Sequence, residues 1–248
     1  MKIDRLTSLL NRFRLMVQPT ALPNANLAAF RNAETGQDNL VFQPRKLGIS
    51  GYDGTLLFAL QVDFGNLTNP LQTALPETVI ELSEPDGDLS NLVSLLASEQ
   101  QNARCGAPAV LGRLGEVLVV RMLRMQLERG AATSGLLAGL AHPRISPAIV
   151  AIHDNPEKPW SNAALADVAG LSQSRFKELF ASTVGITPAS YLRRWRMLLA
   201  RMDLEKGDRV DRIAHRYGYS APDAFSRAFM KEFGVRPSNL AEMLTHAG

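Results

Sequence analysis

Hydrophobic positions along the chain follow two different periods, and the change falls near residue 89. Residues 1–17 are apolar at steps of three and four, which predicts an amphipathic helix. Residues 18–26 include two prolines and predict a connector. Residues 27–83 predict strands, because short apolar runs alternate there with turn residues. The strands are expected at 40–42, 55–64 and 78–82, with a turn at 65–70 and a break at 84–88.

From residue 89 the apolar period is helical. A short helix is expected over 89–97 and a longer one over 108–128, which Gly130 ends. The apolar stripe of the longer helix predicts packing in a core, and the seam of a dimer is the alternative. The predicted fold class is therefore α+β, a small β-rich domain with helices followed by an all-α domain. The stripe consists of Leu111, Leu114, Leu118, Met122 and Met125.

Two segments of the C-terminal part repeat each other in order and spacing. The offset between them is 48 residues up to a shared serine and 49 residues after it, so the second copy carries one inserted residue near 221–224. Such an internal repeat decides the fold. The matching residues are Leu165, Ala166, Gly170, Ser172, Phe176, Phe180, Gly185 and Pro188 in the first copy, and Ile213, Ala214, Gly218, Ser220, Phe225, Phe229, Gly234 and Pro237 in the second.

Each copy predicts a helix, a glycine turn and a second helix. Gly170 and Gly218 allow a positive φ at the turn, and Ser172 and Ser220 follow where an N-cap oxygen is wanted. The two phenylalanines of each copy are four residues apart and so share one buried face. This is the helix-turn-helix arrangement that reads DNA, and packed helix pairs without that role are the alternative. The units are expected at about 163–185 and 210–234.

The segment between the copies predicts one long helix. Thr187 and Pro188 form an N-cap and a first-turn proline, and the helix can run to Lys206 before Gly207. About 19 residues at a rise of ~1.5 Å give roughly 28 Å. Successive major grooves on one side of DNA are ~34 Å apart. The sequence therefore predicts a rod that holds two reading helices in adjacent grooves.

Further residues around the repeat match a known pattern. They include Trp160 and Ser161 before the first unit, Tyr191 and Leu192 between the units, and 225–229 in the second. With them, residues 144–243 resemble the AraC/XylS family of transcription regulators. The resemblance implies sequence-specific binding near promoters, with RNA polymerase as a partner and activation more often than repression.

The N-terminal part resembles the cupin-type sensor domain that precedes this DNA-binding domain. The resemblance is carried by residues 40–45, 62–65 and 69–76. Fewer strands precede residue 40 than in the family, so a shortened barrel is expected. The first histidine of the chain is His142, which argues against the histidine metal site of cupins. The expected domains are a sensor and dimerisation region over 1–141 and a DNA-binding domain over 142–248.

Base contacts are expected from the face of each second helix that lies opposite the phenylalanines. Arg227 is the strongest single candidate, because arginine bound to guanine by two hydrogen bonds is the commonest specific contact. A phosphate contact is its alternative. The carboxylates of Glu178 and Asp223 either accept from cytosine N4 or orient a neighbouring arginine. The predicted set is Gln173, Ser174, Lys177 and Glu178 in the first unit, and Pro222, Asp223, Ser226 and Arg227 in the second.

Phosphate contacts are expected at helix starts and along the long helix. Backbone N–H groups at a helix start can bind phosphate, and helix capping is the competing role of the serines there. The arginines of the long helix lie outside its apolar stripe, where a solvated face is the alternative. The predicted phosphate-contacting residues are Ser161, Ser172, Arg193, Arg194, Arg196 and Ser220.

Charge and composition agree with a soluble DNA-binding protein. The net charge is +3, and residues from 144 onward carry 15 lysines and arginines against 11 acidic residues. No apolar run reaches the ~18 residues of a membrane helix, and the N-terminus lacks a secretory signal, so a cytoplasmic location is expected. Cys105 is the only cysteine, which excludes an internal disulfide; it is either incidental or an oxidant sensor.

No catalytic spacing, phosphate-binding glycine loop or metal site is found, so neither an enzyme nor a cofactor is expected. The expected partners are promoter DNA, RNA polymerase, a small-molecule or redox effector, and a second copy of the chain. Two other function classes stay open. One is an interaction module that no longer binds DNA and inhibits a related regulator, and the other is a cupin-type enzyme.

Overall fold

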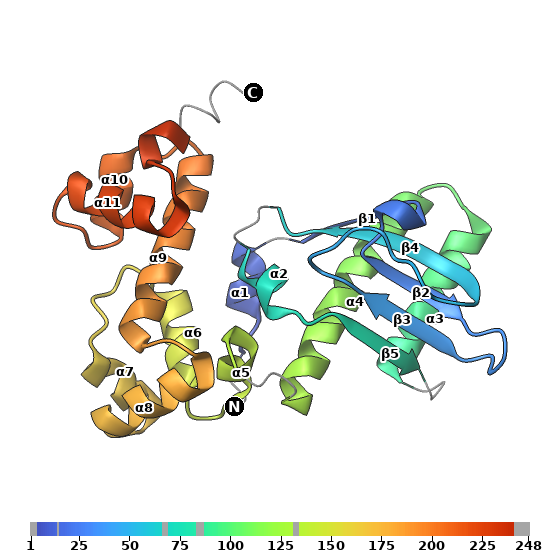
Figure 1. Ribbon diagram of the computed structural model, residues 1–248, viewed down its shortest axis with the longest axis horizontal. Coiled ribbons are helices and arrows are strands. Elements are labelled where there is room, and N and C mark those ends of the chain that lie inside the picture. Colours follow the sequence, from blue (N-terminus) through green and yellow to red (C-terminus); the bar gives the residue numbers. More distant parts are fainter. Residues whose placement is uncertain (1–3, 14, 66–68, 83–86, 131–133, 241–248) are drawn as a thin grey trace. The chain divides into compact units, whose positions relative to one another are not determined.

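The computed structural model describes residues 4–13, 15–65, 69–82, 87–130 and 134–240 (Figure 1). It divides into two compact units, one of residues 9–132 and the other of residues 1–8 and 133–248. The first unit contains an antiparallel sheet with helices, and the second contains helices. The predicted α+β class is confirmed. The division describes packing, and the functional boundary between 141 and 142 stays a prediction.

Five strands form one antiparallel sheet in the order β1-β4-β2-β3-β5. The strands expected at 40–42, 55–64 and 78–82 are confirmed as β3, β4 and β5, and two further strands join them. A bulge in β4 shifts the register opposite Ala29 and Phe30. The strands are β1 (Met16–Pro19), β2 (Leu27–Arg31), β3 (Asp38–Phe42), β4 (Thr55–Asp63) and β5 (Thr78–Leu82).

The central part of the sheet is buried on both faces, which explains the nearly continuous apolar runs of β2, of the end of β3 and of the middle of β4. Helices α3 (Asp88–Asn102) and α4 (Ala107–Arg129) cover one face (Figure 1). The other face has its own apolar cluster, in which the ring of Tyr52 stacks on Phe30 at 5.7 Å between centroids. The buried members of that cluster are Ala25, Ala28, Phe30, Val41, Ile49 and Ala59.

Helix α4 approaches the sheet closely because two of its residues are glycines. A Cβ at Gly112 would lie 2.6 Å from the carbonyl oxygen of Val17, and one at Gly115 would lie 2.5 Å from a methyl group of Val17 and 3.0 Å from one of Leu60. The predicted stripe is confirmed as core at Leu111, Leu118 and Met122, while Leu114 and Met125 are partly buried.

A buried asparagine extends the sheet with its side chain. The Asn26 amide nitrogen donates to the Val62 carbonyl at 2.9 Å, and the Val62 N–H donates to the Asn26 side-chain oxygen at 2.7 Å. The side chain therefore makes the pair of bonds that a strand residue would make with its backbone. Asn26 is only 3% exposed, so these bonds satisfy polar groups that water cannot reach.

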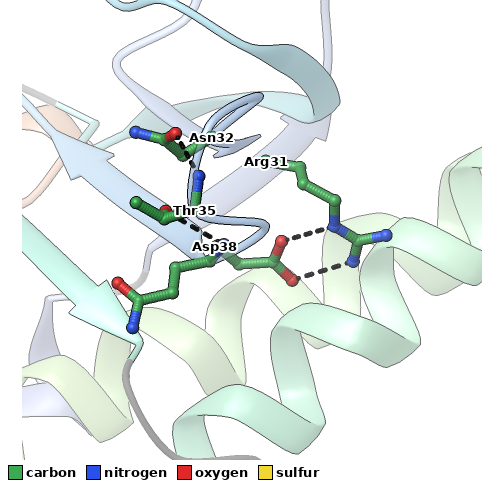
Figure 2. Close-up of polar contacts among 5 residues, drawn as sticks. Arg31, Asn32, Thr35 and Asp38 are labelled. Atoms are coloured by element: carbon green, nitrogen blue, oxygen red, sulfur yellow. Dashed lines mark hydrogen bonds and ion pairs between the residues drawn. The ribbon is translucent and has the colours of Figure 1, made fainter.

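The β2–β3 hairpin is closed by polar side chains at its tip (Figure 2). Arg31 donates from Nε at 2.8 Å and from Nη2 at 3.1 Å to the two carboxylate oxygens of Asp38, its cross-strand partner. The side-chain oxygen of Asn32 accepts from the N–H groups of Glu34 and Thr35, which is the local turn that asparagine favours. These contacts fix the register of β2 and β3 at the turn that connects them.

Within the described residues, the helix predicted over 1–17 is confirmed only for Thr7–Arg12. Helix α1 covers only Thr7–Arg12, and Val17 lies in β1, where it pairs with Val62. The apolar step from Phe13 to Val17 satisfies a helical period, but the buried side chain of Val17 fits a strand equally well. The predicted connector over 18–26 contains the end of β1 and a 3-10 turn, η1, at Leu22–Asn24.

Other boundaries also shift. Helix α3 runs to Asn102 instead of the expected residue 97, and α4 ends at the predicted Gly130, whose φ is +59°. A short helix that was not predicted, α2 (Pro70–Ala74), starts at Asn69, whose side chain accepts from the Leu71 N–H. Parts of the turn at 65–70 and of the break at 84–88 lie outside the described residues.

The C-terminal compact unit consists of helices that surround one long helix. Helix α9 (Pro188–Glu205) contacts α8, α10 and α11, and it ends one residue before the expected Lys206. None of the helices in the described residues is long and apolar enough to cross a bilayer. The others are α5 (Leu136–Ala141), α6 (Ser146–Asp154), α7 (Asn162–Ala169), α8 (Gln173–Val184), α10 (Val210–Arg216) and α11 (Pro222–Phe233).

The close contact of α4 with β1 yields a first prediction. Gly112→Ala forces a methyl group against the Val17 carbonyl, so we expect the free energy of unfolding to fall by about 1–3 kcal/mol. Urea unfolding followed by circular dichroism measures the change. Val117→Ala is the matched control, because Val117 is 47% exposed on the same helix and should change stability by less than about 0.5 kcal/mol. Equal effects of the two substitutions would contradict the packing described.

Candidate DNA interface

The two predicted helix-turn-helix units are present as α7–α8 and α10–α11. The turn of the first unit contains Gly170 with a φ of +62°, and that of the second contains Gly218 with a φ of +81°. Both values lie in the region that glycine adopts without strain. The phenylalanines predicted to be buried are all 0% exposed: Phe176, Phe180, Phe225 and Phe229.

An aromatic cluster attaches the first unit to the N-terminal half of α9. Phe180 packs edge-on against Tyr191 at 5.6 Å between centroids. His153 of α6 stacks on Trp195 at 3.7 Å, and its Nε2 lies 2.7 Å from the Tyr191 hydroxyl. Burial raises the pKa of Tyr191, so this hydroxyl stays protonated. The sequence reasoning missed His153; its place among the apolar residues of α6 was the available signal.

The second unit is attached to the C-terminal half of α9 by charge as well as by packing. Asp203 accepts from Arg216 Nη1 at 2.6 Å and from the Tyr217 hydroxyl at 2.8 Å. Arg216 also donates to Asp208 at 2.8 Å, and these two carboxylates raise the pKa of the guanidinium. The guanidinium of Arg201 lies 5.4 Å from the ring centroid of Phe233. One helix therefore carries both units.

Helix capping agrees with the prediction in the first helix-turn-helix unit and differs from it in the second. Ser161 and Ser172 accept from backbone N–H groups at the starts of α7 and α8, at 3.1 and 3.4 Å. The capping role predicted for Ser220 is wrong, because α11 starts at Pro222 and its N-cap is Ala221, which makes no side-chain cap. The inserted residue moves the helix start one position past the serine.

The predicted base-contacting residues lie on the exposed sides of α8 and α11. On α8 all four are exposed. On α11 three are exposed and Ser226 is partly buried. Arg227 makes no ion pair with any residue that the structure describes. The exposed members are Gln173, Ser174, Lys177 and Glu178 on α8, and Pro222, Asp223 and Arg227 on α11.

The sequence reasoning missed one cation on the first reading helix. Arg175 is exposed, and its Nη1 donates to Glu178 Oε2 at 3.0 Å. The i, i+3 spacing of an arginine and a glutamate on a helix was the signal that could have found this pair.

Three of the predicted phosphate-contacting residues line a common groove. Ser161, Arg193 and Arg196 border a groove of about 360 Å³ with Tyr219 of the second unit. Burial raises the pKa of Tyr219, and the charges of the two arginines oppose that shift. The groove thus has a positive lining at the starts of α7 and α9.

The arginines of α9 differ in what they bind. Arg196 donates from Nε to the Pro156 carbonyl at 2.7 Å and from Nη2 to the Lys158 carbonyl at 2.8 Å, and burial lowers its pKa. Arg194 forms an ion pair with Glu232 at 3.5 Å. Arg193 is exposed and has a weak contact of 3.5 Å with the Ser190 hydroxyl. Arg193 is therefore the α9 arginine most available to an anion.

Two family matches together span most of the chain. Residues 165–243 match the helix-turn-helix domain family, and residues 11–128 match the cupin family. An AraC-like transcription regulator of Streptomyces lividans is 41% identical over 128 residues, which are 51% of this chain and 42% of that protein. The HTH-type transcriptional regulator AlkR of Acinetobacter baylyi is 32% identical over 202 residues, which are 78% of this chain and 65% of that protein.

The chain resembles the AraC-type regulators in both of its parts, as predicted. The chain spans between 42% and 65% of the length of the two relatives named. A solved structure of the DNA-binding domain of AdpA with a target DNA is 27% identical, with 42% of this chain and 95% of that chain covered and a TM-score of 0.39.

Candidate metal ligands do not cluster in the part of the chain that the structure describes. Among residues 4–13, 15–65, 69–82, 87–130 and 134–240, no group of three or more histidine, cysteine or acidic side chains could hold a metal ion. The single cysteine, Cys105, is exposed.

The unequal caps of the two reading helices give a second prediction. Ala221 has the extended backbone of an N-cap, with φ −137° and ψ 135°, so Ala221→Ser should supply the missing oxygen and stabilise the start of α11 by about 1 kcal/mol. Ser172→Ala is the matched change, which should destabilise the start of α8 by about the same amount. Hydrogen exchange of the amides of each helix measures both. Unchanged exchange in α11 and faster exchange in α8 would show that Ala221 does not cap its helix.

Proposed function

We propose that this chain is a sequence-specific transcription regulator that places α8 and α11 in adjacent major grooves of promoter DNA. The observation that carries the proposal is the pair of helix-turn-helix units on one helix, each with buried phenylalanines and an exposed polar face. Helix α9 has 18 residues, which at ~1.5 Å per residue make about 27 Å. This length is of the same order as the ~34 Å between successive major grooves.

The base-contacting residues in this proposal are those predicted on the two helices, with Arg227 the strongest. The carboxylates of Glu178 and Asp223 either accept from cytosine N4 or orient a neighbouring arginine. Its guanidinium is exposed on α11 and can bind guanine with two hydrogen bonds. Arg193, Ser161 and the start of α7 supply phosphate contacts, because the groove that they line is positively charged. Ser172, Ser220, Arg194 and Arg196 complete the proposed phosphate-contacting set.

Residues 1–141 act in this proposal as the sensor and dimerisation region, and residues 142–248 as the DNA-binding domain. The match of residues 11–128 to cupins supports a sensor that responds to a small molecule or an oxidant. The partners proposed besides DNA are RNA polymerase and a second copy of the chain, and the site of action is the cytoplasm. No enzymatic step is proposed, since the named relatives are transcription regulators.

Salt dependence tests whether DNA binding takes place. Fluorescence anisotropy with duplexes selected from a randomised pool should show affinity falling by about 100-fold between 50 and 200 mM salt, if about four phosphates are contacted. Arg193→Ala should weaken binding to all sequences alike and lower the salt slope by about 1. Arg124→Ala, an exposed arginine of α4, is the control that should change neither. Failure of the wild-type protein to enrich any duplex would refute the proposed function.

Base reading by Arg227 is tested separately. Arg227→Ala should cost about 1–3 kcal/mol on the selected duplex and remove the preference for guanine at one position. The measurement is binding to duplexes substituted at each base pair in turn. If the variant binds every duplex as the wild-type protein does, α11 does not read DNA through this residue.

A further inference from the structure

We infer that Arg175, held by Glu178, reads a guanine in the half-site that the first helix-turn-helix unit occupies. The inference rests on the proposed function and deepens it, because it assigns a specific base contact to a residue outside the set expected from the sequence. Three observations support it: the place of the two side chains on α8, the ion pair between them, and the residue at the matching position of α11.

Both side chains are on the side of α8 that faces away from the core. Phe176 and Phe180 are 0% exposed and mark the buried side. At about 100° per residue, Glu178 lies about 180° and Arg175 about 120° from the midpoint of the two phenylalanines. The side chains are 71% and 58% exposed, respectively. A duplex that meets the outer side of α8 therefore meets this pair.

The pair resolves a charge conflict at the most outward position of α8. The repeat aligns Glu178 with Arg227, which lies 49 residues later, so the first unit has a carboxylate where the second has a guanidinium. A lone carboxylate would be repelled by the phosphates on both sides of the groove. Arg175 Nη1 lies 3.0 Å from Glu178 Oε2, which neutralises that charge and brings a guanidinium to the same place.

The geometry leaves the reading edge of the arginine available. Glu178 accepts from Nη1, and no residue in the described part of the chain accepts from Nε or Nη2. These two nitrogens form a flat pair of donors that matches guanine O6 and N7. A carboxylate that already holds the guanidinium lowers the rotational freedom lost on binding. Lys177, the other cation of α8, has a single ammonium group and cannot make this planar contact.

Base-preference profiles of the wild-type protein and four variants test the inference. The wild-type full chain first selects duplexes from a randomised pool, and binding is then measured with each base pair substituted in turn. We expect one guanine in the first half-site to be preferred by about tenfold or more. Arg175→Ala should abolish this preference. Arg175→Lys should weaken the preference but keep the salt dependence, because the charge remains while the planar pair of donors is lost.

The Glu178→Gln variant tests whether Glu178 holds Arg175 in place or contacts a base itself. We expect it to weaken the guanine preference by a few-fold and to leave overall affinity equal or higher, because a carboxylate near phosphate is removed. Loss of a cytosine preference in Glu178→Gln, with Arg175→Ala unchanged, would show that the carboxylate reads the base and would overturn the inference. A uniform loss of affinity in Arg175→Ala, with base preferences kept, would make Arg175 a phosphate contact and overturn it too.

Arg193→Ala is the matched control, since it removes an exposed cation from α9 and should lower affinity without changing any base preference. Thermal unfolding of each variant checks that the exposed substitutions leave the fold intact. If the wild-type protein selects no sequence at all, the proposed function fails. If it selects a sequence that Arg175→Ala reads in the same way, only the assignment of Arg175 fails.

Discussion

Helix α9 must bury one set of side chains at its start and another at its end, and the whole DNA-binding arrangement depends on that constraint. At its start, Tyr191 and Trp195 pack against α8 and the buried His153 of α6. At its end, Asp203 accepts one hydrogen bond from Arg216 of α10 and one from Tyr217, the C-cap residue of α10. Packing along a rigid helix joins the two units more firmly than a loop would, because a helix bends little over five turns.

The two helix-turn-helix units are attached to α9 by different kinds of interaction. The first relies on stacked rings in a dry core, where Phe176, Phe180 and Tyr191 are each at most 8% exposed. The second adds charged hydrogen bonds at its edge, where Arg216 bridges Asp203 and Asp208. Exposed ion pairs weaken in salt, whereas apolar contacts do not. The second unit is accordingly the one whose attachment depends on ionic strength.

Local chemistry made the C-terminal part predictable from the sequence. The signals there each act over a few residues: positive φ at Gly170 and Gly218, N-caps at Ser161, Ser172 and Thr187, and phenylalanines at a four-residue step. The repeat contains the glycine turn and the pair of phenylalanines twice. The start of α11 escaped prediction because a one-residue insertion moves a helix start without changing the residue types around it. The Arg175–Glu178 pair escaped because its i, i+3 spacing was the available signal, and spacing alone does not show that two side chains bond.

Prediction of the N-terminal part was limited by pairing over long distances. Strand β1 was taken for the end of a helix, because four residues carry too little periodicity to distinguish the two, and only its partner β4, more than forty residues later, decides the matter. The cupin resemblance placed a sheet here without fixing its order. That order, β1-β4-β2-β3-β5, depends on pairings between strands that are far apart in the sequence.

The side chain of Asn26 binds Val62 as a peptide group would, and this has a consequence for comparing sequences. Only asparagine offers one donor and one acceptor at the right reach; aspartate lacks the donor, leucine lacks both, and glutamine is one methylene too long. A relative with another residue at this position must therefore join its strands differently. An asparagine that a relative shares at this position indicates the same sheet geometry, and it carries no information about which signal the protein detects.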